Sequence, residues 1–212
     1  MVDKQPIVYL VDDDPSVRKT LPRGLKRRGL NVEAFDSAQE FLDSYSSEQP
    51  GCLILDLSMP GVDGLELQQE LIHRKITIPI IFITGHGSIQ QSVQALRAGA
   101  IDFLEKPFLP DTLANRIAEA FAQDQKTRDK GKKMASIRSG FERLTSREQE
   151  VCQLLLIRQA RLSSKEIARE LGISHRTVEQ HRSRIMEKTN AQSVSELLSL
   201  AALIDLTSFS EA

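Results

Sequence analysis

Five short apolar runs in the first 122 residues constrain the fold of this chain more than any other feature. They are Ile7–Val11, Val32–Phe35, Cys52–Asp56, Ile78–Thr84 and Ile101–Leu104. Four of the runs are almost unbroken, which is typical of parallel strands covered by helices on both faces. Segments with helix-capping signals separate the runs, such as Ser88 with Gln91 three residues later. This alternation predicts an α/β fold, a doubly wound sheet of five parallel strands.

Polar side chains stand at the ends of four of these runs, and the carboxyl ends of parallel strands meet at one edge of a sheet. The set is Asp12, Asp13, Asp56, Thr84 and Lys106. Carboxylate oxygens suit a hard cation, so we expect the three aspartates and the Ser58 carbonyl to hold Mg²⁺. Lys106 and Thr84 supply donors for phosphoryl oxygens, and Asp56 can attack phosphorus as a nucleophile.

In identity, order and spacing, these residues resemble the receiver domains of bacterial response regulators. The stretches 84–87 and 98–108 are similar to the FixJ branch in particular. The resemblance covers about residues 5–122 and implies a flavodoxin-like fold in which Asp56 accepts phosphate from a sensor histidine kinase. It also implies that Thr84 and Phe103 act as a switch pair, and that the bond between Lys106 and Pro107 is cis.

The charge of the chain is distributed unevenly, although the formal net charge of the 212 residues is only −1. Residues 1–122 carry an excess of acidic side chains, and residues 123–140 carry six basic against two acidic ones. Residues 141–212 are balanced, so any DNA binding there must come from charges clustered on one face. Residues 123–140 read either as a linker or as a polar extension of the fifth helix; we favour a partly helical linker.

A helical pattern covers the last part of the chain, residues 141–208, where four short helices are expected. Thr145 with Glu148 starts the first, and Ser193 with Glu196 starts the last. The middle two are capped by Ser164 and by Ser174, and the tight turn with Gly172 between them predicts a helix-turn-helix. The chain is thus expected to hold a small all-α four-helix domain after the α/β domain.

In a helix-turn-helix, the second helix enters the major groove and its first turns meet the base edges. Here that helix covers about residues 175–189, with Val178 and Ile185 on its buried side. Polar side chains on its other side suit base contacts, and the surrounding cations suit phosphates. The expected DNA contacts are Lys165, Arg176, Thr177, Glu179, Gln180, His181, Arg182, Ser183, Arg184 and Lys188.

This segment resembles the LuxR/NarL-type DNA-binding domain in three stretches, residues 144–151, 165–168 and 176–181. The sequence departs from that family's pattern at residues 157–163, where a shorter turn with glycine is common. We expect a longer helix or loop there, in which Arg158 and Arg161 add phosphate contacts. The resemblance also implies that the last helix helps to pair two domains on DNA.

The sequence therefore predicts a two-domain response regulator whose phosphorylation promotes dimerisation and binding to paired DNA half-sites. The expected partners are a sensor histidine kinase, double-stranded DNA, RNA polymerase and a second copy of the chain. The two cysteines lie in apolar runs, and the longest apolar stretch, residues 76–83, is too short to span a bilayer. We expect free thiols, no membrane segment and a cytoplasmic protein.

Three other functions fit parts of the sequence less well. A phosphotransferase with an aspartate nucleophile would need a general acid two residues after Asp56, where Ser58 stands, so we expect no enzymatic turnover beyond self-dephosphorylation. A protein adaptor without DNA binding does not account for the reading helix. A dinucleotide enzyme would need a glycine-rich turn after the first strand, where three aspartates stand.

Overall fold

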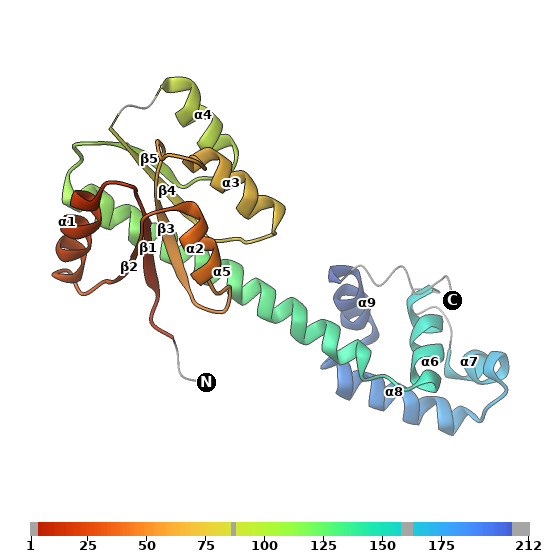
Figure 1. The fold of residues 1–212 in the computed structure, drawn as a ribbon. Coiled ribbons are helices and arrows are strands. Elements are labelled where there is room, and N and C mark those ends of the chain that lie inside the picture. Colours follow the sequence, from red (N-terminus) through yellow and green to blue (C-terminus); the bar gives the residue numbers. More distant parts are fainter. Residues whose placement is uncertain (1–3, 86–87, 158–162, 205–212) are drawn as a thin grey trace. The chain divides into compact units, whose positions relative to one another are not determined.

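The structure is a computed structural model that describes residues 4–85, 88–157 and 163–204 (Figure 1). The chain divides into two compact units, residues 1–128 and 129–212, which are considered separately below. In the described residues, no helix is both long enough and apolar enough to cross a membrane.

The first unit is built on a five-stranded parallel sheet, as predicted, and the strand order is β2-β1-β3-β4-β5. The strands are β1 (Ile7–Val11), β2 (Asn31–Phe35), β3 (Gly51–Asp56), β4 (Ile80–Thr84) and β5 (Asp102–Glu105). The fourth strand begins two residues later than predicted. Pro79 precedes it and has no N–H to give to a strand ladder, although its carbonyl accepts the N–H of Leu53.

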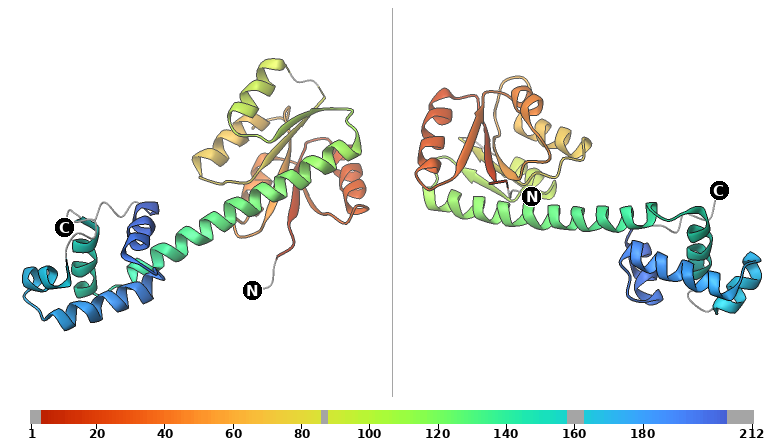
Figure 2. Two further views of the ribbon diagram at one scale, coloured as in Figure 1. Left: turned by 180° about the vertical axis from the view of Figure 1, so that it is seen from behind. Right: turned by 90° about the horizontal axis from the view of Figure 1, so that it is seen from below.

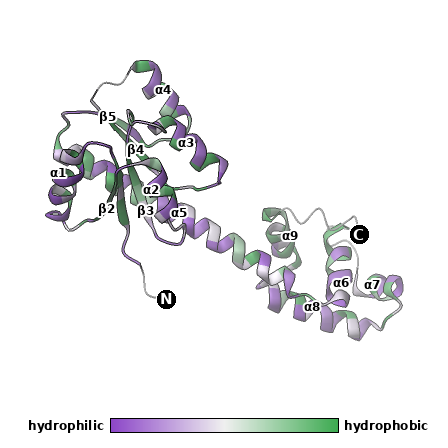
Figure 3. Ribbon diagram, in the orientation of Figure 1, coloured by the Kyte–Doolittle hydropathy of each residue, from purple (hydrophilic) through white to green (hydrophobic). Residues whose placement is uncertain are grey.

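Helices cover both faces of this sheet (Figure 2). They are α1 (Pro15–Lys26), α2 (Ala38–Ser44), α3 (Gly64–His73), α4 (Ile89–Arg97) and α5 (Pro110–Glu142). Alternate residues of each strand point to opposite faces, so Cys52 and Ile54 pack toward α1 and α5, whereas Leu53 and Leu55 pack toward α2, α3 and α4. The strands are drawn mainly in the hydrophobic colour of Figure 3, as two-sided burial requires.

One expectation about α5 is corrected. Residues 123–140 are helical throughout, because α5 continues to Glu142, so this segment is an extension of the fifth helix and not a partly helical linker. The helix is packed at two separate places. Within the first unit, Asp124 accepts the N–H of Gly51 and Arg128 donates to the carbonyl of Gln49, whereas Ile137 and Phe141 belong to the core of the second unit.

Among its described residues, 129–157 and 163–204, the second unit contains four further helices, as predicted. They are α6 (Ser146–Ile157), α7 (Ser164–Leu171), α8 (His175–Thr189) and α9 (Val194–Leu203). Gly172 ends α7 in the left-handed conformation, with φ 65°, and so makes the expected turn into α8. The cap of α7 is corrected: Ser163, and not Ser164, accepts the N–H of Glu166, whose side chain reaches back to complete a capping box.

Candidate functional site

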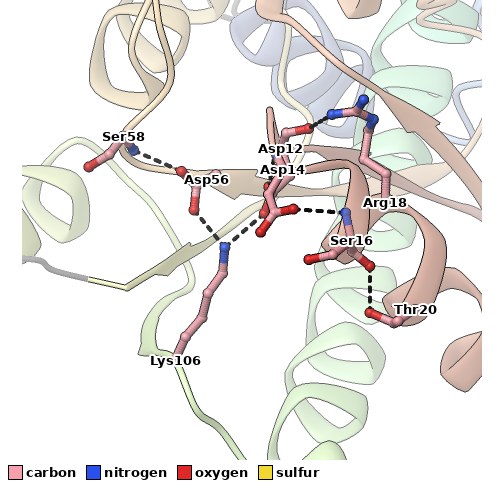
Figure 4. Close-up of polar contacts among 8 residues, drawn as sticks. All are labelled: Asp12, Asp14, Ser16, Arg18, Thr20, Asp56, Ser58 and Lys106. Atoms are coloured by element: carbon pink, nitrogen blue, oxygen red, sulfur yellow. Dashed lines mark hydrogen bonds and ion pairs between the residues drawn. The ribbon is translucent and has the colours of Figure 1, made fainter.

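Four of the predicted residues of the first unit lie at the carboxyl edge of the sheet. Asp12 follows β1, Asp56 ends β3, Thr84 ends β4 and Lys106 follows β5. Figure 4 shows the ammonium of Lys106 between the carboxylates of Asp12 and Asp56. The parallel topology produces this convergence, since it brings residues 94 positions apart in sequence into direct contact.

An ion-pair triad, formed by Asp12, Asp56 and Lys106, is the centre of this site. The ammonium lies 2.8 Å from Asp12 Oδ2 and 2.8 Å from Asp56 Oδ1. Asp12 is 1% exposed and Asp56 5% exposed, so both carboxylates are withdrawn from water. The triad holds two negative charges and one positive charge, which leaves an excess of negative charge at a buried site.

The triad shifts the protonation equilibria of two of its members. Burial raises the pKa of Asp56 above the usual value, Lys106 opposes this rise, and the charge of Asp12 adds to it. Burial alone would lower the pKa of Lys106, but its hydrogen bonds to Asp12 and Asp56 outweigh that effect and raise the pKa. The site therefore keeps Lys106 charged and disfavours charge on Asp56, as expected where a further cation would stabilise the carboxylate.

The backbone around Asp56 is held tightly. The N–H of Ser58 donates to Asp56 Oδ2 at 3.0 Å, and the N–H of Gly64 donates to the carbonyl of Leu57. A Cβ atom at Gly64 would lie 2.4 Å from the carbonyl oxygen of Asp56, closer than any side chain tolerates. Gly64 is thus a residue of this site that the sequence analysis missed, although the capping pair of Asp63 and Glu66 around it marked the start of α3.

Two further hydrogen bonds hold Asp12 at the end of β1. Its Oδ1 accepts the N–H of Asp14, and its carbonyl accepts a hydrogen bond from the guanidinium of Arg18 at 2.8 Å. Asp13, which we expected to bind the metal, is exposed. In the part of the chain that the structure describes, no cluster of three or more His, Cys, Asp and Glu side chains could hold a metal ion.

The residues present nevertheless fit Mg²⁺. This ion keeps several waters and binds through one or two carboxylates, and Asp12 and Asp56 offer two with an uncompensated negative charge.

Thr84 and Phe103 lie on neighbouring strands beside the triad. Thr84 is fully buried, and its carbonyl accepts the N–H of Lys106 at 2.7 Å. Phe103 is half-buried and stacks on Phe82, with ring centroids 6.1 Å apart. The peptide bond between Lys106 and Pro107 is cis, as the family resemblance implied. His86, which the sequence places in the loop after Thr84, lies outside the described residues.

The second unit presents α8 as predicted. Val178 and Ile185 are fully buried in its core, and Glu179, Gln180 and Ser183 are exposed on the other side of the helix. Figure 3 draws much of α8 in the hydrophilic colour. A helix with one buried face and a polar outer face near its start has the form that base reading requires.

The expected phosphate-contacting side chains around α8 divide into two groups. Lys165, Arg176 and Arg184 are exposed. Arg182 is half-buried and donates to the hydroxyl of Ser164 at 2.7 Å, and Lys188 is bound to Glu148 at 2.6 Å. The side chains of Arg182 and Lys188 therefore bind other groups of the protein itself.

Thr177 and His181, also predicted to contact DNA, are both partly buried. Thr177 shares a 2.7 Å hydrogen bond with Ser174 at the start of α8, and Nδ1 of His181 is buried and has no partner among the residues described. Contact of His181 with DNA must therefore use Nε2. Arg158 and Arg161, which we expected to add phosphate contacts, lie outside the described residues.

One family model matches each unit of the chain. A family model described as "Response regulator receiver domain" matches residues 8–118, and one described as "Bacterial regulatory proteins, luxR family" matches residues 142–201. The first match lies within the first unit and the second match within the second, in the order that the sequence predicted.

Individual relatives match along nearly the whole chain. Nodulation protein W of Bradyrhizobium diazoefficiens is 40% identical over 201 residues, covering 95% of this chain and 87% of that protein. Transcriptional regulatory protein FixJ of the same organism is 40% identical, covering 92% of this chain and 93% of that protein. The solved structure of response regulator StyR has a TM-score of 0.83 and 43% identity, covering 93% of this chain and 98% of that one.

Proposed function

We propose that this chain, which belongs to the response regulators that join a receiver domain to a LuxR-type DNA-binding domain, is switched by a phosphoryl group on Asp56. Members of this family are transcription regulators rather than classical enzymes, and phosphorylation generally controls them. The observation that supports Asp56 is the buried ion-pair triad, which places a nucleophilic carboxylate 2.8 Å from a fixed positive charge.

Asp56 attacks the phosphorus of a phosphohistidine on the sensor kinase. A P–O bond forms to Asp56, the P–N bond breaks, and its electron pair leaves on the imidazole nitrogen. Lys106 stabilises the phosphoryl oxygens, and the hydroxyl of Thr84 donates to one of them. Asp12, Asp13, Asp56 and the Ser58 carbonyl are the residues that would hold Mg²⁺, which when bound neutralises charge on the incoming phosphoryl group. Hydrolysis of its own aspartyl phosphate is the one turnover that we assign to the chain.

A phosphoryl group adds charge beside Thr84, and we infer that Thr84 and Phe103 then move together. This movement changes the neighbouring face of α4 and β5. Three apolar side chains of α4 are already exposed there, Ile89 at 85%, Val93 at 41% and Leu96 at 45%. Pairing two receivers through this face would cover them, and this supports dimerisation of the phosphorylated chain.

A dimer presents two copies of α8 to paired half-sites, which strengthens binding through the second contact rather than through new base contacts. Glu179, Gln180 and Ser183 read the bases, because they are exposed in the first nine residues of α8. The remaining proposed contacts are to phosphates, from Lys165, Arg176, Thr177, His181, Arg182 and Arg184. As a transcription regulator, the bound dimer acts in the cytoplasm and on RNA polymerase.

The test compares the full-length chain with the Asp56→Asn variant, with and without Mg²⁺ and acetyl phosphate as phosphodonor. Light scattering reports the dimer, and an acid-labile phosphate assay reports the modification. We expect the wild-type chain to be modified and to dimerise, and the variant to do neither. Asp36→Asn, at an exposed aspartate of the same domain, is the matched control. Dimerisation of Asp56→Asn on addition of phosphodonor would refute the proposed switch.

A further inference from the structure

Lys188 stands at the end of α8 and is bound on two sides inside the DNA-binding domain. Its ammonium donates to Glu148 Oε2 at 2.6 Å and to the carbonyl of Arg143 at 2.9 Å. The side chain is 30% exposed, whereas that of Glu148 is only 2% exposed. The position in sequence suggested a phosphate contact, but the contacts of the ammonium are to the protein itself.

Glu148 holds the side chain of Lys188 in this position. The carboxylate is in the first turn of α6, where it also accepts the N–H of Thr145 at 2.8 Å. In the described part of the chain, Lys188 is the cation with which Glu148 forms an ion pair. Removing the cation that pairs with a buried carboxylate strongly destabilises the folded protein. Moving the ammonium to a DNA phosphate would therefore leave Glu148 buried and unpaired.

A second set of contacts fastens the same end of α8 to the residues that follow α5. The guanidinium of Arg143 donates to the carbonyl of Lys188 at 3.1 Å, so each of these two side chains binds the carbonyl of the other residue. The carbonyl of Lys188 is among the last of α8, which have no partner within the helix itself. Gly140 fits closely here, since a Cβ atom on it would lie 2.9 Å from that carbonyl oxygen.

We propose that Lys188 is a positioning residue that acts on DNA reading through Glu148 and Arg143, and not a phosphate contact. It fixes the end of α8 against the start of α6 and the end of α5. Because α8 has 15 residues and is about 22 Å long, a small tilt at this end moves the base-reading turn by several ångström. This inference rests on the proposed role of α8 as the reading helix.

The experiment uses the salt dependence of DNA affinity, because each lost phosphate contact reduces the slope of log K against log salt by about 0.9. The full-length chain with phosphodonor is titrated against a duplex that it has selected from random sequence, and against an unselected duplex of equal length. The variant Lys188→Met is expected to keep the wild-type slope and to lose selectivity for the selected duplex by at least tenfold. Its unfolding temperature is expected to fall.

Glu148→Gln is the second variant, and it keeps Lys188. If Lys188 positions α8, Glu148→Gln loses selectivity for the selected duplex as Lys188→Met does. The conservative variant Lys188→Arg, in contrast, retains the selectivity of the wild-type chain. If Lys188 contacts a phosphate, Glu148→Gln binds at least as tightly as wild type, and Lys188→Met reduces the slope by about 1.8, one contact for each chain of the dimer. Either of those two results overturns the inference. Unchanged selectivity in a Lys188→Met protein of lowered unfolding temperature also overturns it, since Lys188 is then merely structural.

Arg176→Met is the matched control, at an exposed cation in the first turn of α8. It is expected to reduce the slope by about 1.8, because each of the two chains of the dimer loses one contact, and to leave the unfolding temperature unchanged. If the wild-type chain enriches no duplex, the proposed function has failed. If the wild-type chain and Arg176→Met behave as expected but Lys188→Met does not, only the inference about Lys188 has failed.

Discussion

In the receiver domain the two carboxylates of the ion-pair triad are buried and bound to Lys106, whereas on the reading helix the side chains assigned to bases are exposed. Asp12 and Asp56 are almost inaccessible and share Lys106, and Glu179, Gln180 and Ser183 face solvent. A buried polar group costs stability as soon as one partner is lost, but an exposed one does not. Changes in the first region are thus expected to alter folding, and changes in the second to alter DNA binding alone.

The largest loss of stability is expected from Arg128→Ala. Arg128 binds the buried carboxylate of Asp124 at 2.6 Å and the carbonyls of Ser47 and Gln49 at 2.7 Å each. Removing it leaves a buried charge without its cation, so the free energy of unfolding of the receiver should fall by about 3 kcal/mol. Urea denaturation measures this change, with the exposed neighbour Lys126→Ala as control. Equal effects of the two substitutions would show that Arg128 does not anchor α5.

Gly64→Ala is expected to cost about 1–3 kcal/mol, since its new methyl group would meet the carbonyl oxygen of Asp56. It should also slow phosphorylation, because the backbone of the acceptor must shift. Gly24→Ala is the matched control, in a helix where a Cβ atom meets nothing within 4 Å, and it should stabilise the protein slightly. Urea denaturation and the rate of labelling by acetyl phosphate test both variants. A harmless Gly64→Ala would contradict the close packing of α3 on Asp56.

Gln180→Ala extends the comparison to the reading helix, where we expect an effect on binding without one on folding. Discrimination at one base pair of the selected duplex should fall by about 1–2 kcal/mol, with an unchanged unfolding temperature because the side chain is exposed. Competition binding with single-base variants of the duplex identifies the affected position. The exposed Gln192→Ala is the control. A uniform loss over all base pairs would place Gln180 on a phosphate instead.

The smallest expected effect is a pH dependence from Glu148, the buried exception within the DNA-binding domain. Burial would raise the pKa of Glu148, but Lys188 and Thr145 outweigh burial and lower the pKa below its usual value near 4.5. A pKa that is lower in the folded state gives stability that is complete above the unfolded pKa and is lost as the pH falls through the folded one. Below about pH 4.5, the Glu148→Gln variant should therefore lose less stability than the wild-type chain. Thermal unfolding at a series of pH values measures this difference. An equal loss of stability with falling pH in the two proteins would contradict the ion pair between Glu148 and Lys188.

The sequence predicts well whatever depends on strand topology and helix periodicity. Asp56 and Lys106 meet because parallel strands share an edge, and Val178 and Ile185 are buried because they recur on one side of a helix. It predicts poorly what depends on contacts between distant residues. Nothing local to Lys188 shows that Glu148, 40 positions away, takes its charge, and nothing local to Gly64 shows how near Asp56 lies.

The helical extension of α5 was underestimated for a similar reason. Residues 123–140 show no apolar stripe long enough to predict a helix, because the groups that hold this segment are few and far apart. Asp124 is fixed by the N–H of Gly51, and Ile137 and Phe141 are buried in the core of the DNA-binding domain. Tertiary packing at separated points can thus maintain a helix that its local sequence only weakly specifies.

The central claim is that phosphate on Asp56 controls how the reading helix engages DNA. Its most direct test is selection of binding sites from random or genomic DNA by the full-length chain, with and without Mg²⁺ and acetyl phosphate. The account predicts a motif of two paired half-sites, enriched by the wild-type chain mainly with phosphodonor and not by Asp56→Asn. Equal enrichment of one motif under both conditions would contradict phosphate as the control, and enrichment of no motif would contradict the DNA reader itself.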